Sequence, residues 1–281
     1  MGMPIGPRAM WKSALEHFIA DSKKNALTPA IYSVPPDALP LLLELDLRVE
    51  KVGENGILDL PEFSLAGARR EGIRRGRRKL AERAGATFLL SEPPHDPALL
   101  ERLRPVSDAW LKANGGREKS FSLGQFSPAL LNRSPVGIVE LKGVCAAFGS
   151  LFVTPDKSWA GIDQMRYDPA TSVTNTMDFL LVELILWAKA EGYQRFDLAM
   201  APLAGLVDEK HAPLFAQVGH FIYERSGQFY NFQGLRRFKE KFAPVWEPRY
   251  LAAPEYWALP FALAQVALLT SGRGKIAPGE Q

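Results

Sequence analysis

One run of residues constrains the fold more than any other part of the chain. Residues 175–191 have the length of a helix, and nearly every side chain from Met177 to Trp187 is apolar. A helix that is apolar on all sides has to be buried. The carboxylate of Glu183 inside it must then be ion-paired, protonated or directed into a cavity. Glu183 is therefore a candidate site residue, with a structural ion pair as the alternative.

Helices and strands alternate around this run. Helices are expected at 9–22, 65–84, 97–113 and 175–191, and strands at 29–34, 47–54, 57–60, 87–91, 136–141, 144–153, 161–167 and 194–200. Glu54-Asn55-Gly56 predicts a hairpin turn between strands 47–54 and 57–60. The order helix, antiparallel strands, helix, strand, helix is expected of a GNAT-type acyltransferase unit.

The length of 281 residues suits two such units. The proline-rich stretch 92–97 is the clearest linker, so we predict an N-terminal domain at 1–97, containing the basic helix 65–84, and a catalytic domain at 98–281. The predicted fold class is α/β (α+β): tandem GNAT-like acyltransferase units whose mixed, mostly antiparallel sheets are flanked by helices. The duplication is inferred from element order, since the sequence itself shows no repeat.

Composition limits the kinds of site that the chain can carry. Hydrophobic residues make up 47% and charged residues 23%, a profile typical of a globular protein. The net charge is only +3, so anion binding must come from local clusters of cations. The single cysteine, Cys145, excludes a disulfide framework and indicates a reducing cytoplasm. It lies in an apolar run and is interpreted as a small buried hydrophobic residue.

The helix predicted at 65–84 is strongly basic. Eight cations fall within fifteen residues: Arg69, Arg70, Arg74, Arg75, Arg77, Arg78, Lys79 and Arg83. Arginine outnumbers lysine seven to one, which favours phosphate binding because the planar guanidinium grips phosphate through two bonds. The alternative is a solvated surface helix. The candidates for binding tRNA or lipid phosphate are Arg70, Arg74, Arg77 and Arg78.

Aromatic rings and cations also alternate from Phe229 to Phe242 and on to Tyr250. Large rings beside arginine and lysine suit a partner that is both anionic and flat, such as a nucleotide or a lipid phosphate group. Packing alone explains the rings but not the cations. The candidate site residues in or next to this block are Glu224, Tyr230, Asn231, Arg236, Lys239, Lys241 and Arg249.

Two predicted strands carry further charged candidates. In the strand at 161–167, Asp163 and Arg166 are three residues apart and alternate between faces. They are interpreted either as a substrate-binding pair or as a local salt bridge. In the strand that contains Asp197, the same alternation directs that carboxylate toward solvent or a cleft.

Three segments, Asp163–Arg166, Met177–Leu203 and Tyr230–Tyr250, resemble the C-terminal catalytic domain of the aminoacyl-phosphatidylglycerol synthases. This is the lysyl- and alanyl-phosphatidylglycerol synthase family of the multiple peptide resistance factor type. The resemblance implies that the chain moves lysine or alanine from aminoacyl-tRNA to the glycerol hydroxyl of phosphatidylglycerol. It implies no cofactor and no covalent enzyme intermediate, because the ester on tRNA is already activated.

The resemblance also implies roles for the candidates. Lys239 or Arg236 would stabilise the oxyanion, Arg166 would hold a phosphate or carbonyl, and Glu224, Glu183 or Asp163 would accept the proton. Binding of the α-amino group is the alternative role of Asp163. The remaining substrate-binding candidates are Asp197, Tyr230, Asn231, Lys241 and Arg249.

Other chemistries lack their sequence signals. There is no HExxH or CxxC motif, so no metal site is expected. The nearest approach to a coenzyme A loop, 69–74, has arginine where a small residue is needed, which argues against that donor. Two alternatives stay open: another GNAT-type transferase that acts on acetyl-CoA or a peptidoglycan precursor, and a non-catalytic tRNA- or membrane-binding module.

No apolar run reaches the roughly 18 to 20 residues needed to span a bilayer. The sequence therefore predicts a cytoplasmic protein at the inner face of the membrane, without the transmembrane region and flippase activity typical of the family. Residues 257–270 are interpreted either as a core-packed closing helix or as a face that rests on lipid, with Tyr256 and Trp257 at the interface.

Overall fold

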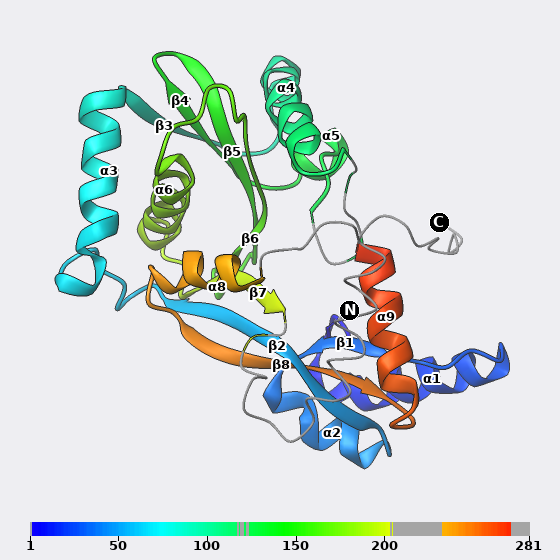
Figure 1. The fold of residues 1–281 in the computed structure, drawn as a ribbon. Helices are drawn as coiled ribbons and strands as arrows, with labels where there is room; N and C mark the ends of the chain where they lie inside the picture. Colours follow the sequence, from blue (N-terminus) through cyan, green and yellow to red (C-terminus); the bar gives the residue numbers. More distant parts are fainter. Residues whose placement is uncertain are drawn as a thin grey trace. The chain divides into compact units, whose positions relative to one another are not determined.

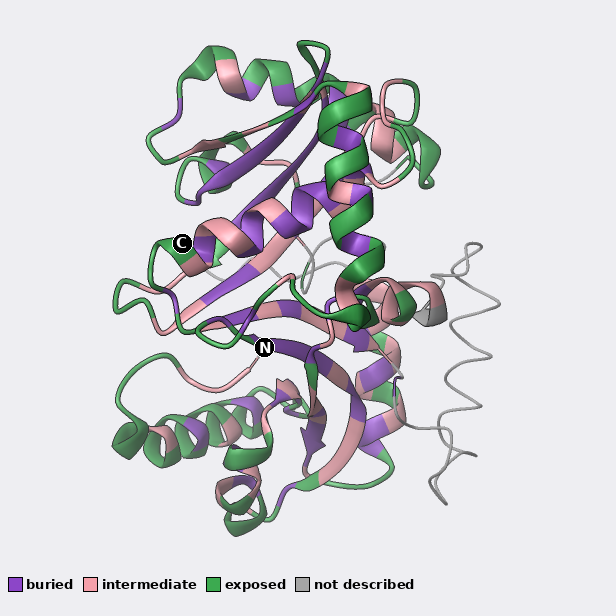
Figure 2. Ribbon diagram, turned by 90° about the vertical axis from the view of Figure 1, so that its left-hand side faces the viewer, coloured by how far each residue is buried: buried purple, intermediate pink, exposed green. Residues whose placement is uncertain are grey.

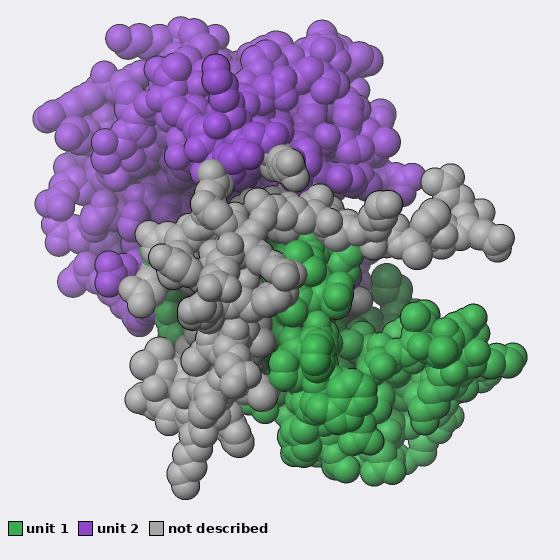
Figure 3. Space-filling model, turned by 45° about the vertical axis from the view of Figure 1, so that its right-hand side comes forward, with its two compact units in different colours: residues 1–55, 200–236, 246–281 green, residues 56–199, 237–245 purple. Residues whose placement is uncertain are grey.

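The computed structural model describes residues 2–116, 118, 121, 124–202, 204 and 232–270, with backbone alone at 232 and 233 (Figure 1). The chain divides into two compact units, coloured separately in Figure 3. Unit 1 comprises Met1–Asn55, Met200–Arg236 and Trp246–Gln281, and unit 2 comprises Gly56–Ala199 and Arg237–Val245. No boundary falls near residue 97. A division into compact units does not test whether the chain contains two GNAT-like domains. The predicted domains at 1–97 and 98–281 therefore stay a prediction.

Unit 2 contains a mixed sheet. Its strands are β3 (Ala86–Ser91), β4 (Val136–Leu141), β5 (Val144–Val153), β6 (Trp159–Tyr167) and β7 (Arg195–Pro202), whose last residues belong to unit 1. Strands β3 to β6 pair antiparallel in order, and β7 runs parallel to β6, with Trp159 opposite Arg195 and Gly161 opposite Asp197. This confirms the predicted fold class of mixed, mostly antiparallel strands flanked by helices.

Five helices of the described chain lie wholly or partly in unit 2. They are α3 (Glu71–Ala84), which follows the turn η3 (Ala68–Arg70), α4 (Pro97–Ala113), α5 (Pro128–Leu131), α6 (Thr176–Ala190) and α8 (Phe232–Glu240). Helix α3 buries Ile73, Gly76 and Leu80 and exposes most of its remaining surface (Figure 2). The predicted apolar stripe of the basic helix is thus the side that docks.

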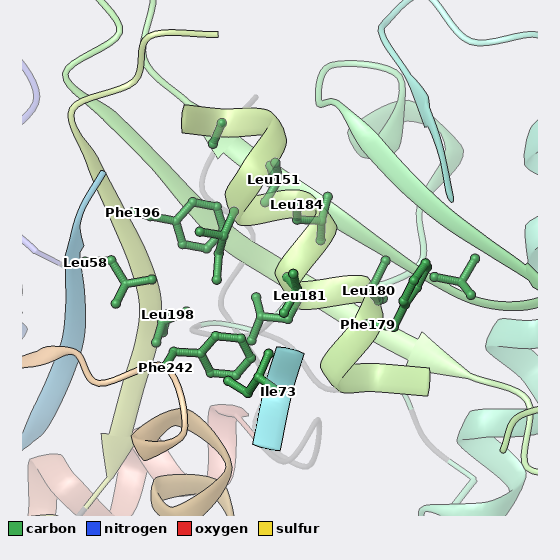
Figure 4. Packing of buried hydrophobic residues seen from close by; sticks show 14 of the residues in the cluster. Leu58, Ile73, Leu151, Phe179, Leu180, Leu181, Leu184, Phe196, Leu198 and Phe242 are labelled. Atoms are coloured by element: carbon green, nitrogen blue, oxygen red, sulfur yellow. The ribbon is translucent and has the colours of Figure 1, made fainter. Parts of the chain in front are cut away.

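Helix α6 is the centre of the unit 2 core, as its apolar sequence predicts. Phe179, Leu181 and Leu184 of α6 pack with Phe196 of β7 and with other buried residues that Figure 4 labels. The helix lies close to the sheet: a Cβ atom built on Gly137 of β4 would lie 2.5 Å from a methyl carbon of Leu184. Glycine at 137 therefore permits the approach of α6.

Unit 1 is built from a second group of elements. Its strands are β1 (Ile31–Val34), most of β2 (Arg48–Asp59) and most of β8 (Val245–Ala253), and β1 pairs antiparallel with β8. Its helices are α1 (Trp11–Lys24), α2 (Leu39–Glu44), the first part of α8 and α9 (Ala258–Thr270), with turns η1 (Arg8–Met10) and η2 (Pro36–Ala38). In the described residues no helix is both long and apolar enough to cross a membrane.

The hairpin predicted at Glu54-Asn55-Gly56 is wrong, because β2 is one continuous strand through these residues. Asn-Gly is only a local preference for a turn, and burial of β2 on both sides of it, at Val52 and Ile57, outweighs that preference. The strand also lies against the Ala201 carbonyl oxygen, only 2.7 Å from where a Cβ atom of Gly53 would be.

Candidate functional site

Two predicted site residues of unit 2, Asp197 and Lys239, hold the backbone of Ala199 in β7. Ala199 has a φ of +63°, a left-handed conformation that costs free energy for a residue with a side chain. Asp197 Oδ1 accepts a hydrogen bond from the Ala199 amide at 2.7 Å, and Lys239 Nζ donates one to the Ala199 carbonyl at 2.8 Å. The structure therefore brings these two candidates together at one distorted point of the strand.

Lys239 itself is an unusual cation. Its side chain comes from α8 and the residue is only 5% exposed. Burial lowers the pKa of Lys239 to about 8, and the negative charge of Asp197 opposes that shift. An ammonium group with this pKa is charged at neutral pH and releases its proton readily, which suits a group that stabilises or transfers charge.

Asp163 lies on β6 in a second polar cluster of unit 2. Ser150 Oγ on β5 donates a hydrogen bond to Asp163 Oδ2 at 2.8 Å. Burial raises the pKa of Asp163, against the lowering effects of Ser150 and Arg166. The segment at Gly124 passes directly over the carboxylate, since a Cβ atom there would lie 2.5 Å from Asp163 Oδ1.

Arg166 is buried and fully engaged inside unit 2. Its guanidinium binds both carboxylate oxygens of Glu118, at 2.9 and 2.6 Å, and donates to Ser107 Oγ at 2.6 Å. It also lies 5.2 Å from the ring centre of Trp110. These contacts favour a structural role for Arg166, but its salt bridge is formed with Glu118 and not locally with Asp163. The catalytic role of Arg166 stays a prediction.

Glu183 on α6 is ion-paired, which answers the question raised by its burial. Arg77 Nε lies 2.6 Å from Glu183 Oε1 and Arg77 Nη2 lies 3.1 Å from Oε2. This hydrogen-bonded pair raises the pKa of Arg77. The geometry favours a structural ion pair between α3 and α6, and the role of Glu183 as a proton acceptor stays a prediction.

A cavity of about 770 Å³ lies along α3 within unit 2. Phe88 and Phe179 give it an apolar wall, and it is also lined by Arg74, Arg75, Arg77 and Arg78 of α3. Arg75 and Arg78 form no ion pair with any described residue, so both remain available to an anion. The combination of flat rings and free guanidinium groups fits a phosphate-bearing ligand with an apolar face.

The other arginines predicted to bind phosphate are held by the protein backbone. Arg70 donates to the Phe242 carbonyl at 3.2 and 3.0 Å, and Arg74 donates to the Gly67 carbonyl at 3.0 Å. Burial lowers the pKa of Arg70. Together with Arg77, these side chains hold α3 and the turn before it in place. Arg75 was not predicted to bind phosphate, yet it lines the cavity.

Two further candidates lie in unit 1. Arg236 Nη1 lies 2.9 Å from Glu54 Oε2, and its guanidinium lies 4.8 Å from the ring centre of Trp246. Arg249 is buried, with long contacts of 3.4 Å to Glu247 and 3.3 Å to the Pro248 carbonyl. The Arg236 guanidinium is thus oriented by a carboxylate and a ring of unit 1, and the Arg249 guanidinium by a carboxylate and a backbone oxygen of the same unit.

Lys241 lies in unit 2, where Asp178 of α6 binds it at 2.9 Å through each carboxylate oxygen. Asp178 lies in the first turn of α6, where a carboxylate also favours the helix dipole, so this ion pair adds a second structural role. Glu224, Tyr230 and Asn231 lie outside the described residues, so their predicted roles stay predictions.

Sequence reasoning missed the partners of these groups. Glu54, Glu118 and Ser150 each contact a predicted candidate. Glu54 was interpreted only as part of a turn, and neither Glu118 nor Ser150 stands out by spacing or motif. Each lies on a different segment of the chain from the candidate that it contacts. No signal in a single sequence links such residues before the fold is known.

Comparisons with known proteins show which sequences and structures this chain resembles. The family model described as "Phosphatidylglycerol lysyltransferase, C-terminal" matches residues 1–253. The phosphatidylglycerol lysyltransferase of Staphylococcus epidermidis is 32% identical over 260 residues, which make up 92% of this chain and 30% of that protein. The chain thus spans about 30% of the curated relatives that it matches.

Two solved structures are similar over nearly the whole chain. The C-terminal domain of an Agrobacterium fabrum protein assigned as a lysylphosphatidylglycerol synthetase has 34% identity and a TM-score of 0.85, covering 98% of this chain and 83% of that one. L-PGS from Bacillus licheniformis has 32% identity and a TM-score of 0.85, covering 97% of this chain and 82% of that one.

Proposed function

The chain belongs to the family of C-terminal domains of phosphatidylglycerol lysyltransferases, and from this membership we propose that it transfers an amino acid to phosphatidylglycerol. The named relatives are longer than this chain, which spans 30% of their length. The proposal concerns the transfer step only. It extends to this chain the activity that those relatives carry in their names.

The proposed donor is aminoacyl-tRNA and the proposed acceptor is the glycerol hydroxyl of phosphatidylglycerol. The hydroxyl oxygen forms a new ester bond to the aminoacyl carbonyl carbon, and the bond from that carbon to the ribose oxygen of tRNA breaks. One proton passes from the glycerol hydroxyl to the released ribose oxygen. The reaction needs no cofactor, because one activated ester is exchanged for another and the protein positions the reactants.

The observation that carries the proposal is the contact between Lys239 and Ala199. A buried ammonium group with a pKa of about 8 lies at a distorted point of β7, beside the carboxylate of Asp197. Positive charge in a poorly solvated place strongly stabilises a developing oxyanion. We assign this role to Lys239, and Asp197 keeps the local backbone in place through its bond to the Ala199 amide.

The cavity along α3 supports aminoacyl-tRNA as the donor. Arg75 and Arg78 are free of ion pairs with described residues, and the aromatic wall of Phe88 and Phe179 suits the flat face of a base. Binding by such a surface depends on phosphate neutralisation and weakens as salt increases. We propose that α3 holds the phosphates of the donor tRNA.

Lysine is the favoured amino acid over alanine, because the curated relatives are named as lysyltransferases. Asp163 is the carboxylate that we assign to the amino group of the transferred residue, and Ser150 orients it by a hydrogen bond. Since phosphatidylglycerol is a membrane lipid and charged tRNA is cytoplasmic, the proposed reaction places the chain at the inner face of the membrane.

The test is lipid aminoacylation by the purified chain, with vesicles containing phosphatidylglycerol and tRNA charged with radiolabelled lysine or alanine. Thin-layer chromatography of the extracted lipid separates the product. We expect labelled lipid with lysyl-tRNA, and a loss of about a hundredfold or more in Lys239→Met. Tight tRNA binding without any product lipid would contradict the proposal and favour the non-catalytic alternative.

Lys189 provides a matched control in the same unit. Its ammonium also donates to backbone carbonyls, those of Pro61 and Phe63, at 2.8 and 2.7 Å. Lys189→Met removes a backbone-binding ammonium without touching β7, so its transfer rate should stay near that of the unaltered chain. Equal losses in the two variants would assign the effect of Lys239 to folding.

A further inference from the structure

Three large aromatic side chains are exposed together at the start of α9 in unit 1. Tyr256, Trp257 and Phe261, here called the aromatic patch, are 65%, 64% and 68% exposed. The rings of Trp257 and Phe261 lie edge to face with their centres 6.4 Å apart. Exposed rings grouped in this way mark an interaction surface more often than a chance feature.

The rest of α9 explains why these rings do not enter the core. Ala258, Leu259, Leu263 and Val266 form the buried side of the helix and pack against residues such as Leu251 of β8. No residue from Ala258 to Thr270 is charged. The core is therefore already filled by the opposite side, and the aromatic patch remains as a second apolar surface of the same segment.

A cation accompanies the aromatic patch. The guanidinium of Arg48 on β2 lies 5.7 Å from the ring centre of Tyr256. Arg48 is exposed and forms no ion pair in the part of the chain that the structure describes. Glu255 precedes Tyr256 in the sequence, and Asp46 and Glu50 each lie two residues from Arg48. Rings beside a cation without a carboxylate partner match the headgroup layer of an anionic bilayer, where tryptophan and tyrosine are favoured.

We propose that the aromatic patch and Arg48 dock unit 1 on the surface of a bilayer that contains anionic phospholipid. The inference rests on the proposed function, since a phosphatidylglycerol substrate lies in such a bilayer, and it names the surface that meets it. The patch lies beyond residue 253, where the match to the family model ends, so the family match does not assign it. The rings enter the headgroup layer, and Arg48 contacts lipid phosphate.

Vesicle sedimentation tests the docking without tRNA, so its outcome is independent of whether transfer occurs. The probes are vesicles of phosphatidylcholine alone and of equal parts phosphatidylcholine and phosphatidylglycerol. The full chain should bind the mixed vesicles. Trp257→Ser with Phe261→Ser should lower that partition about tenfold or more, because two apolar rings are lost. Arg48→Ser should mainly remove the part of vesicle binding that depends on phosphatidylglycerol. Glu255→Gln removes a negative charge beside the patch and should strengthen binding to the mixed vesicles.

Phe152→Ser is the matched control, since Phe152 of β5 is 64% exposed but lies in unit 2. Its vesicle binding should equal that of the unaltered chain. Equal partition of the double variant and the unaltered chain would overturn the proposal. A dimer in sedimentation velocity that the double variant dissociates, with no vesicle binding, would also overturn it by assigning the patch to a second copy. Vesicle binding without lipid aminoacylation would uphold the surface and refute the proposed function alone.

Discussion

The guanidinium of Arg77 binds both carboxylate oxygens of Glu183, at 2.6 and 3.1 Å, and so joins the basic helix α3 to the apolar helix α6. Glu183 is the more buried partner, with 13% of its side chain exposed against 42% for Arg77. Most of the cost of breaking the pair therefore falls on the side chain that lies against the core.

Glu183→Gln should destabilise unit 2. The amide keeps the shape of the carboxylate but leaves the Arg77 guanidinium with a neutral partner, and solvent screens part of the loss because Arg77 is partly exposed. We expect about 1–2 kcal/mol less unfolding free energy in urea. Glu191→Gln, which removes an exposed pair with Lys157, is the control and should cost about 0.5 kcal/mol or less. Equal effects of the two substitutions would contradict this account.

Stability should depend on pH through Lys239. Its folded pKa of about 8 lies below the ordinary lysine pKa of 10.5, so between these pH values the unfolded chain binds more protons than the folded chain. Stability then rises as pH increases from about 8 to 10.5, by up to about 3 kcal/mol, and below pH 8 the full cost of the buried charge is present. Urea unfolding of the unaltered chain and of Lys239→Met across this range measures the difference. A constant difference would show that Lys239 is charged equally in both states.

The sequence allowed most of unit 2 to be predicted, because its strongest signals are local. The all-round apolar pattern of α6, the strands at 136–141 and 144–153, and the docking stripe of α3 all follow from residue periodicity. What failed depended on contacts between distant segments. The Asn55-Gly56 turn signal lost to burial of β2, and the partners of Glu183 and Arg166 come from α3 and from the segment at Glu118. Periodicity shows that a charge is buried but not which distant residue neutralises it.

Charge neutralisation on α3 should control tRNA affinity. Arg75→Gln with Arg78→Gln removes two guanidinium groups that have no ion pair with a described residue and that line the 770 Å³ cavity. We expect weaker binding of lysyl-tRNA and a slope of log K against log salt that is shallower by about one to two. Filter binding at several salt concentrations measures both quantities.

The control for that experiment is Lys23→Gln with Lys24→Gln, at the exposed end of α1 in unit 1. It removes the same charge from the chain, so it accounts for the change in net charge. A salt slope that falls equally in both double variants would assign the effect to the overall charge and not to the cavity along α3.

A side chain at position 124 should destabilise unit 2, because Gly124 passes over the carboxylate of Asp163. A Cβ atom there would lie 2.5 Å from Asp163 Oδ1 and 2.9 Å from Asp163 Cγ, so the segment or the carboxylate must move. Gly124→Ala should cost about 1–3 kcal/mol of unfolding free energy and lower lipid aminoacylation by displacing Asp163.

The same substitution at Gly72 should change the free energy of unfolding in the opposite direction. It lies in α3, and a Cβ atom there would meet nothing within 4 Å. Gly72→Ala should therefore stabilise the chain by about 0.5–1 kcal/mol, since alanine favours the helix. Thermal unfolding of both variants compares the two glycines directly. If Gly124→Ala were as stable as Gly72→Ala, the close approach of Gly124 to Asp163 would not exist in solution, and Asp163 would be free to adopt another orientation.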